Sequence, residues 1–399
     1  MSRKKIILYV MLTALLSSIL TIAGICFMLE LNFGRAANLA RLLSAMHFIE
    51  QNYIENVDYT KMIDGAIGGM VHSLGDPHSV YLDQRLYNQV KSDTSGSFGG
   101  IGVYMGFKNG DVHIISVMPN SPGASVGLQA GDRILAVDGT PVTEIVPDEV
   151  AIKIRGEAGT NVDLLIGRDG QEDKTYTVTR DIINVRTVAD KMLDDKIGYI
   201  RITSFSEKTG EEFRAALDDL ASKNMKGFVL DLRENPGGVI TSCVEVAKEI
   251  VPKGPIVSVI QRDGSKEVYE SDLEETKYQI VVLMDQNSAS ASELLAGALQ
   301  DTKAATIVGT KSYGKGSVQT VMPMFHEDGL KLTIAKYYTP NERSIDGVGI
   351  EPDVEIESDR LIMPRLFSVE TNVNDDVQLA KGVEVLKDKL KTKEDSNDK

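Results

Sequence analysis

The spacing of apolar residues first indicates a helical segment near the start of the chain. Asn38–Ile54 reads NLARLLSAMHFIEQNYI, with apolar residues at helical intervals. Tyr59–Leu82 repeats the pattern, and Gly75-Asp76-Pro77 is a helix-ending signal. We therefore expect a helical N-terminal segment over residues 36–93.

Residues 94–182 show a different pattern. Short runs rich in β-branched residues, such as DVHIISV, DRILAVD and KTYTVTR, are separated by Asn-Gly, Asp-Gly and Pro-Gly turns. Pro147–Gly156 (PDEVAIKIRG) is the one helix-like piece between them. The pattern predicts a compact, mostly β module.

From residue 183 onward, apolar strand-like runs alternate with amphipathic helical runs. Gly227–Arg233 (GFVLDLR) and Gln279–Asp285 (QIVVLMD) predict strands, and the segments between them predict helices. Such alternation implies right-handed crossovers and a largely parallel sheet. We expect an α/β core over 183–360, followed over 361–399 by a helix and a charged tail with frayed ends.

The first 30 residues predict a membrane anchor. Arg3, Lys4 and Lys5 precede 24 uncharged residues, Ile6–Leu29. As a helix this run would span about 36 Å, enough to cross a bilayer. The preceding basic residues predict a cytoplasmic stub and an exported remainder. A cleaved signal peptide is the alternative, although no A-x-A-like cleavage site follows the run.

Composition limits the possible partners and cofactors. The 399 residues carry a net charge of −15, which argues against nucleic acid as a ligand. Cys26 lies in the apolar N-terminal run, so Cys243 is alone in the remainder; no intrachain disulfide or cysteine metal site is expected, and Cys243 fits a small core residue. His72 and His78 flank the Gly-Asp-Pro break, where a helix end is favoured over a metal pair.

Asp285–Asp301, DQNSASASELLAGALQD, contains a serine with two interpretations. Ser290 and Glu293 form an S-x-x-E capping box before an apolar helical run. A turn from strand to helix also suits a nucleophile, because unsatisfied N–H groups at the helix start can hold an oxyanion. At this point both interpretations stand.

A lysine downstream could serve as the base. Lys315 lies between Gly314 and Gly316, where other backbone can approach closely. Burial lowers the pKa of a lysine from about 10.4 and yields a neutral amine that can take a serine proton. In an extended strand Lys315, Ser317 and Gln319 share one face, so the Gln319 amide could orient the amine. A solvated loop lysine is the alternative.

These segments together resemble one family, the carboxyl-terminal processing peptidases, which are serine peptidases with an inserted PDZ domain. The resemblance runs from about residue 36 to 355. It rests on seven motifs in order: SLGDPHSVYL, SGSFGGIG, GLQAGDRILAVDG, DLRENPGG, SASASELLAGALQD, GTKSYGKGSVQ and YYTPNERSIDGVGIEPD. It implies a crotonase-like tail-specific protease core, with residues 94–182 as the PDZ domain.

The resemblance also implies residue roles. Ser290 is the nucleophile, Lys315 the base and Gln319 the third member of a Ser-Lys-Gln triad, while the flanking serines belong to the turn. The backbone N–H groups of Gly237, in DLRENPGG, and Ala291 form the oxyanion hole. Two departures from the family pattern are Asn287, where glycine is common, and Glu234, where asparagine is common.

In the PDZ domain the resemblance implies capture of a C-terminal carboxylate. Gly99–Val103 reads GGIGV, and the expected carboxylate-binding residues are Gly100, Ile101, Gly102 and Val103. A glycine-rich bend is the alternative. Arg155 is a candidate for a gating contact between the PDZ domain and the core, with a solvated or locally paired charge as the alternative.

The resemblance thus implies a bacterial, membrane-anchored, extracytoplasmic serine endopeptidase. Its partners are protein or peptide substrates with an apolar C-terminus, and the helical N-terminal segment supports a homodimer. No metal and no cofactor are expected. Two alternatives remain: a catalytically silent PDZ adaptor that binds protein tails, and a Ser-His-Asp hydrolase using His326 and Asp301.

Overall fold

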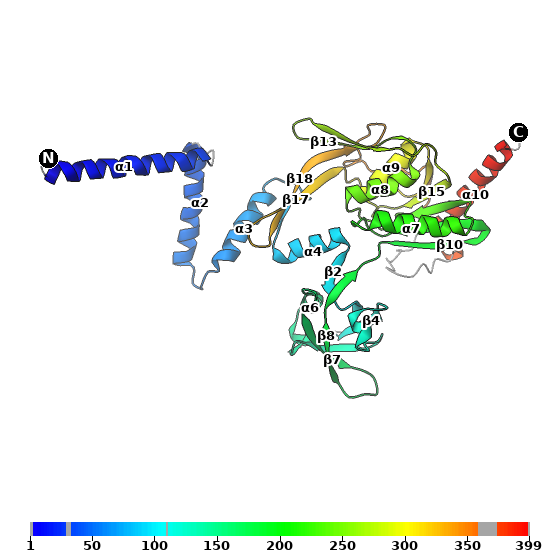
Figure 1. Cartoon of the computed structure of the whole chain (residues 1–399), viewed down its shortest axis with the longest axis horizontal. Helices are drawn as coiled ribbons and strands as arrows, with labels where there is room; N and C mark the ends of the chain where they lie inside the picture. The colour runs from blue at the N-terminus through cyan, green and yellow to red at the C-terminus, as the bar shows by residue number, and fades with distance from the viewer. Residues whose placement is uncertain (1–2, 29–32, 109–110, 358–372, 398–399) are drawn as a thin grey trace. The chain divides into compact units, whose positions relative to one another are not determined.

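The computed structural model describes residues 3–28, 33–108, 111–357 and 373–397. Contacts divide the chain into two compact units, residues 1–81 and 82–399. Figure 1 shows the helices and strands of both units, which are described separately below.

The first unit is helical. It contains α1 (Arg3–Met28), α2 (Phe33–Asn52) and α3 (Tyr59–His72), and the short strand β1 (Val80–Leu82) spans the boundary to the second unit. Asp58 caps α3 by accepting the N–H groups of Thr60 and Lys61. Within the described residues, none of the helices combines the length and apolar character that a membrane span requires. The predicted transmembrane anchor therefore lacks structural support; residues 1, 2, 29 and 30 of that prediction lie outside the described ranges.

The second unit begins with α4 (Gln84–Ser95) and continues into the β module. Asp83 caps the start of α4, and Gly96, at φ 64°, ends it in the left-handed conformation. The module follows in this order: β2 (Ser97–Gly100), β3 (Val103–Lys108), β4 (Asp111–Val117), α5 (Pro122–Ser125), β5 (Arg133–Val137), β6 (Thr140–Pro141), η1 (Val142–Glu144), α6 (Pro147–Ile154), β7 (Asn161–Gly167), β8 (Lys174–Thr179) and β9 (Asp181–Asn184).

The strands of the module are antiparallel, in the order β3-β4-β5-β7-β8, with β6 on β5 and a separate β2–β9 pair. Alternate residues of β7, Val162, Leu164 and Ile166, are fully buried in its apolar core. The predicted mostly β module is thus confirmed.

The α/β core contains two sheets. The strands of the larger sheet lie in the order β10-β11-β12-β15-β16-β19, in which every neighbouring pair is parallel except β10–β11. Its strands and helices are β10 (Val188–Met192), η2 (Asp194–Lys196), β11 (Ile197–Ile202), α7 (Thr209–Ser222), β12 (Gly227–Asp231), α8 (Ile240–Ile250), β15 (Gln279–Met284), α9 (Ala291–Asp301), β16 (Ala305–Gly309) and β19 (Val354–Glu355). The second sheet includes β13 (Gly254–Gln261), β14 (Lys266–Ser271), β17 (Ser317–Pro323) and β18 (Gly329–Tyr338).

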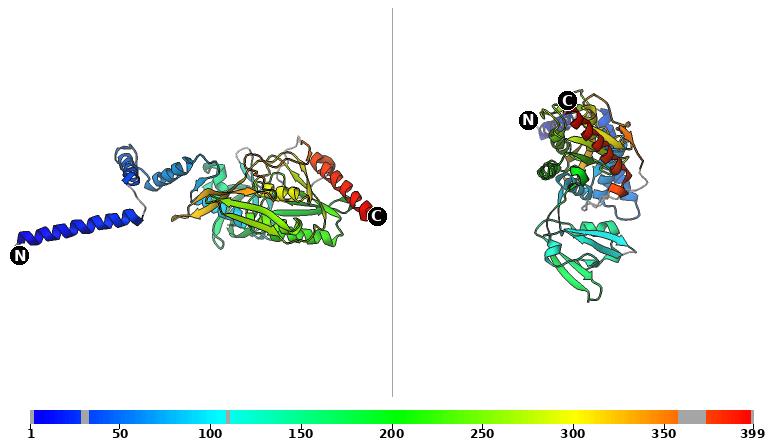
Figure 2. Two further views of the ribbon diagram at one scale, coloured as in Figure 1. Left: turned by 90° about the horizontal axis from the view of Figure 1, so that it is seen from above. Right: turned by 90° about the vertical axis from the view of Figure 1, so that its right-hand side faces the viewer.

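The larger sheet is covered on both faces, as its nearly continuous apolar strands predict. Phe228 and Leu230 of β12 pack in the apolar cluster that includes α7, α8 and α9, whereas Val229 packs in the cluster that includes the C-terminal helix. That helix follows η3 (Val373–Asp375) and is α10 (Val377–Asn397), which Figure 2 draws in red beside the core.

The C-terminal helix is an integral part of the core. Leu379 and Leu386 have no exposed surface, and α10 contacts β12, β15 and β16. The expected helix is present and continues to Asn397. Residues 361–372, 398 and 399 of the predicted C-terminal segment lie outside the described ranges.

Candidate active site

Ser290 lies at a strained turn between β15 and α9. Its side chain is in the buried N-terminal position of α9, with φ 54° and ψ −115°. A positive φ is uncommon for a residue with a side chain and marks a position held in place by its surroundings. The hydroxyl contacts the phenol of Tyr337, whose pKa is raised by burial. A strained position at the start of a helix fits the predicted nucleophile, whose role remains a prediction.

The flanking serines have structural partners. Ser288 donates its hydroxyl to the Leu232 carbonyl at 2.9 Å and accepts the Asp285 N–H at 2.9 Å. Ser292 donates to the Asn235 carbonyl at 3.0 Å. Both serines therefore bind the turn to its neighbour, as the sequence predicts.

Glu293 does far more than cap a helix. Its carboxylate is fully buried, and Oε2 accepts the Ser290 N–H and the Lys315 N–H, each at 2.8 Å. Oε1 accepts the Gly314 N–H at 2.7 Å and the Ser312 hydroxyl at 2.5 Å. One carboxylate thus joins the backbone of the predicted nucleophile to the backbone of the predicted base. The S-x-x-E pattern indicated the helix cap, but no sequence signal indicated the bonds from Ser312, Gly314 and Lys315.

Lys315 is half-buried in the loop between β16 and β17. A side chain on the neighbouring Gly316 would come within 2.4 Å of the Asp346 backbone nitrogen, so glycine is required there. Tyr313 also joins this loop to the turn before α9, because its N–H donates to the Ser288 carbonyl at 3.1 Å. The crowding that the flanking glycines predicted is present.

Gln319 lies on β17 after a register shift in its pairing with β18. Its amide donates to the Ser317 hydroxyl at 2.8 Å and to the Thr333 hydroxyl at 3.3 Å. Ser317 and Gln319 therefore share a face, as predicted. The roles of Lys315 as base and Gln319 as its orienting partner remain predictions.

The turn of DLRENPGG lies directly against the nucleophile. A Cβ on Gly237, which has φ 96°, would lie 2.8 Å from Ser290 Cβ and 2.9 Å from the Ala291 nitrogen. The Gly237 N–H donates to Asn235 Oδ1 at 2.9 Å. Among the described residues the N–H groups of Ala291 and Gly238 make no such hydrogen bond. Ala291 thus has a donor available for an oxyanion, whereas the Gly237 donor is engaged; both oxyanion assignments remain predictions.

Two other candidate chemistries are disfavoured. Burial raises the pKa of the Cys243 thiol to about 12, and its sulfur contacts the Ala291 carbonyl at 3.2 Å, as a core residue would. His326 is exposed in the turn between β17 and β18. Asp301 lies at the opposite end of α9 from Ser290, about 16 Å away along the helix, and pairs with Arg343 at 2.5 Å. A Ser-His-Asp triad therefore does not form from these residues.

The loop before β3 presents backbone donors. Ile101 and Gly102 use their carbonyls to accept the N–H groups of Gly123 and Met118, both at 2.8 Å. Their own N–H groups make no hydrogen bond among the described residues. Val103 begins β3 opposite Val117, and Gly100 ends β2. The donors expected to hold a carboxylate are thus available, although the assignment itself stays a prediction.

Arg155 directly follows α6 and lies beside β2, the strand that leads into the loop before β3. Its guanidinium lies 4.2 Å from the centroid of the Phe98 ring. Burial raises the pKa of Asp93 on α4, and the charges of Arg155 and Lys331 oppose that rise. Arg155 therefore has local partners, and its gating role remains a prediction.

The fold and the site define a PDZ-containing peptidase. Residues 196–356 match the family model "Peptidase family S41", residues 113–168 match "PDZ domain", and residues 29–86 match "Activating protease CtpB N-terminal domain". A crystal structure of a putative S41 protease from Bacteroides fragilis shows the same fold, with a TM-score of 0.50 at 17% identity, covering 86% of this chain and 96% of that one.

The more specific similarity is to curated proteases. The chain is 40% identical over 328 residues to the carboxy-terminal-processing protease of Bartonella bacilliformis, covering 80% of this chain and 75% of that protein. It is 38% identical over 323 residues to carboxy-terminal processing protease CtpB of Bacillus subtilis, covering 79% and 67%. The chain belongs to the carboxy-terminal-processing protease family of serine-type peptidases. The predicted family, PDZ domain and peptidase class are confirmed.

Proposed function

We propose that the protein is a serine endopeptidase that captures the free C-terminus of a protein through residues 100–103 and cleaves nearby with Ser290. The observation that carries the proposal is the bridging carboxylate of Glu293. It accepts N–H groups from both Ser290 and Lys315, so nucleophile and base belong to one rigid assembly.

In the proposed reaction Lys315, as a neutral amine, takes the proton of the Ser290 hydroxyl while the oxygen attacks the substrate carbonyl. The Ala291 N–H stabilises the oxyanion of the tetrahedral intermediate, and the Gly237 turn packs against Ser290 and holds it in position. Lys315 then gives its proton to the departing amine, leaving an acyl-enzyme that water hydrolyses. Gln319 orients the lysine amine without adding charge.

The proposed recognition step uses backbone donors. The N–H groups of Ile101 and Gly102 receive the terminal carboxylate, and the substrate tail pairs with β3 as an added strand. The half-buried side chains of Val103 and Met105, which pack against the module's apolar core, support a preference for apolar tails.

The proposed setting is outside the cytoplasm of a bacterium. Three basic residues followed by 24 uncharged ones support export of the chain. Protease treatment of wall-stripped cells should digest the peptidase, and N-terminal sequencing of the recovered protein would show whether the first 30 residues are retained. Protection of the peptidase would refute the export proposal.

The proposed oligomer is a homodimer formed through α2 and α3. Their apolar side chains are exposed to an extent that a stable monomer would avoid: Leu39, Leu43, Phe48, Ile49 and Met70. Sedimentation of the wild type and of Phe48→Asp should give a dimer and a monomer, respectively. A monomeric wild type would refute the proposal.

The catalytic proposal is tested with a peptide that has an apolar, unblocked C-terminus. Mass spectrometry should locate cleavage near that end in the wild type, and Ser290→Ala should bind the peptide without cutting it. Binding without cleavage by the wild type would instead support the adaptor alternative.

A further inference from the structure

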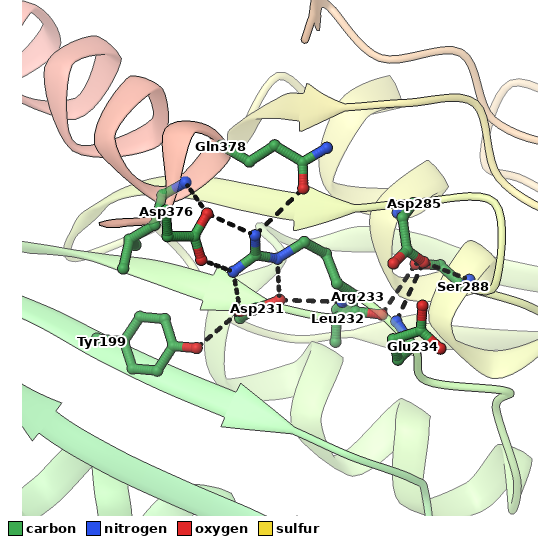
Figure 3. Close-up of polar contacts among 10 residues, drawn as sticks. Tyr199, Asp231, Leu232, Arg233, Glu234, Asp285, Ser288, Asp376 and Gln378 are labelled. Atoms are coloured by element: carbon green, nitrogen blue, oxygen red, sulfur yellow. Dashed lines mark hydrogen bonds and ion pairs between the residues drawn. The ribbon is translucent and has the colours of Figure 1, made fainter. Parts of the chain in front are cut away.

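A buried arginine lies directly before the turn that contacts Ser290. Arg233 has no exposed surface, and its guanidinium has a partner for every N–H, as Figure 3 shows. Nε and Nη2 donate to the two oxygens of Asp231 at 2.9 and 2.6 Å. Nη1 and Nη2 donate to the two oxygens of Asp376 at 2.9 and 2.8 Å, and Nη1 also donates to Gln378 Oε1 at 3.1 Å.

Glu234 and Asn235, which follow Arg233, are hydrogen-bonded to the loop that contains Ser290. The Glu234 N–H donates to Asp285 Oδ1 at 3.0 Å, and the same oxygen accepts the Ser288 N–H at 3.1 Å. The Asn235 carbonyl accepts the Ala289 N–H at 3.0 Å. Residues 234–238 are therefore held between the nucleophile's loop on one side and Arg233 on the other.

Asp376 comes from the far end of the chain. It caps α10, accepting the Leu379 N–H on Oδ1 at 3.0 Å. The helix then packs on the sheet so closely that a Cβ on Gly382 would lie 2.9 Å from Leu283 Cδ2. The residues matching the S41 family model end at 356, so Asp376 and α10 lie beyond them.

We propose that Asp376 is a positioning residue: by clamping Arg233 it fixes the turn 234–238 against Ser290, so that docking of α10 completes the active site. The inference rests on the proposed catalytic role of Ser290. Paired, charge-assisted hydrogen bonds fix a guanidinium in orientation as well as in place. Without the Asp376 carboxylate, Asp231 still pairs with the charge, but Nη1 and Nη2 each lose an acceptor, and a buried donor without an acceptor is unfavourable. Movement of Arg233 would then displace the turn that follows it.

The test is Asp376→Asn in the full-length chain. We expect kcat to fall about 10²-fold with KM within about twofold, because a displacement of roughly 1 Å at a reacting centre costs about that factor. The affinity for a peptidyl aldehyde, whose adduct with Ser290 places an oxyanion against the turn, should fall in parallel with kcat. Asp376→Glu, which keeps the charge, should recover part of the loss.

The matched control is Val383→Ala, which removes buried contact from α10 without touching Arg233. It should lower Tm yet leave kcat unchanged well below the transition. If Asp376 is merely structural, the two variants will lose activity only in proportion to their loss of folded protein, which would overturn the inference.

Two further outcomes are distinguishable. If Asp376→Asn does not fold, Gln378→Ala decides: a fall in kcat at constant KM supports the inference, and an unchanged kcat overturns it. If Ser290→Ala retains activity, the proposed function itself fails. If Ser290→Ala is inactive while folded Asp376→Asn has normal kcat and aldehyde affinity, only the positioning role fails.

Discussion

Two glycine-containing turns, residues 234–238 in the core and residues 99–103 in the PDZ domain, are built in contrasting ways. The core turn is fixed by three buried side chains: Arg233 directly before it, Asn235 within it and Asp285 beside it. The PDZ loop is held mainly by backbone bonds to its carbonyls, and the N–H groups of Ile101 and Gly102 stay available.

The difference fits the role proposed for each turn. Stabilising a transition state requires donors whose positions are fixed before the reaction. Capturing a tail requires donors that are open until the ligand supplies the acceptors. Substitutions at the core turn, or at the residues that fix it, should therefore lower kcat. Substitutions at the PDZ loop should raise KM.

The largest effect is expected at the nucleophile and base. Ser290→Ala and Lys315→Ala should each lower kcat by at least about 10⁴-fold, and the double variant should be little worse, because the residues act as a unit. Circular dichroism should show both folded. Multiplicative losses in the double variant would argue against a Ser-Lys pair.

The next effect tests the bridge between these two residues. Glu293→Gln keeps the size of the side chain but replaces one acceptor oxygen by a donor facing backbone N–H groups, so kcat should fall about 10²-fold through misplacement of the loop. Ser312→Ala, which removes one of the four donors, should be milder. Steady-state kinetics give kcat for both variants. An equal loss of kcat in the two would contradict the bridging role of Glu293.

Carboxylate capture by the PDZ loop is tested by changing the C-terminus of the substrate. Amidation of the C-terminus should raise KM by about 10-fold or more, since hydrogen bonds to a charged group contribute about 1.5–3 kcal/mol. Binding to the inactive Ser290→Ala protein, measured by calorimetry, should weaken by the same factor. Equal KM values for the acid and the amide would place carboxylate capture elsewhere.

The buried cluster of the core should also respond to acid. Burial would raise the pKa of Asp231, but the charge and hydrogen bonds of Arg233, with the charge of Arg201, lower it to about 2. Because the folded-state pKa lies below the ordinary value of 3.8, this carboxylate stabilises the fold above that value. The stabilisation should be lost as pH falls from about 4 toward 2.

Denaturant unfolding at several pH values measures this loss. Asp195→Asn is the control, because its lysine pair is exposed and should contribute little. A free energy of unfolding that did not change over this pH range would contradict the assignment of Asp231 as the ionised partner.

The smallest effect is expected at Arg155. Loss of its contact with Phe98 should lower kcat only a few-fold in Arg155→Ala, since an exposed cation–π contact contributes about 0.5–1 kcal/mol. Tail binding should be nearly unchanged if Arg155 acts in gating. Lost binding, measured by calorimetry with the same peptide, would place Arg155 in the groove instead.

Much of this protein is determined by local sequence. Apolar alternation and turn residues predict the β module and the parallel sheet, because periods of 2 and 3.6 report which face of an element is buried. The strand–turn–helix pattern placed Ser290 at an elbow, and the glycines beside Lys315 and in DLRENPGG indicated close backbone approach. These features depend on residues only a few positions apart.

The tertiary structure decided the partners of the buried polar groups. Glu293 meets Lys315 22 residues away, and Arg233 meets Asp376 143 residues away. No periodicity specifies such pairs, because they depend on how the sheets and α10 pack. The structure likewise gave Ser290 its positive φ and engaged the Gly237 N–H with Asn235, whereas the apolar run at the N-terminus had predicted an anchor that the described helices do not support. A buried charge or donor must be satisfied by whatever group the folded chain brings within about 3 Å, and only the assembled fold determines that group.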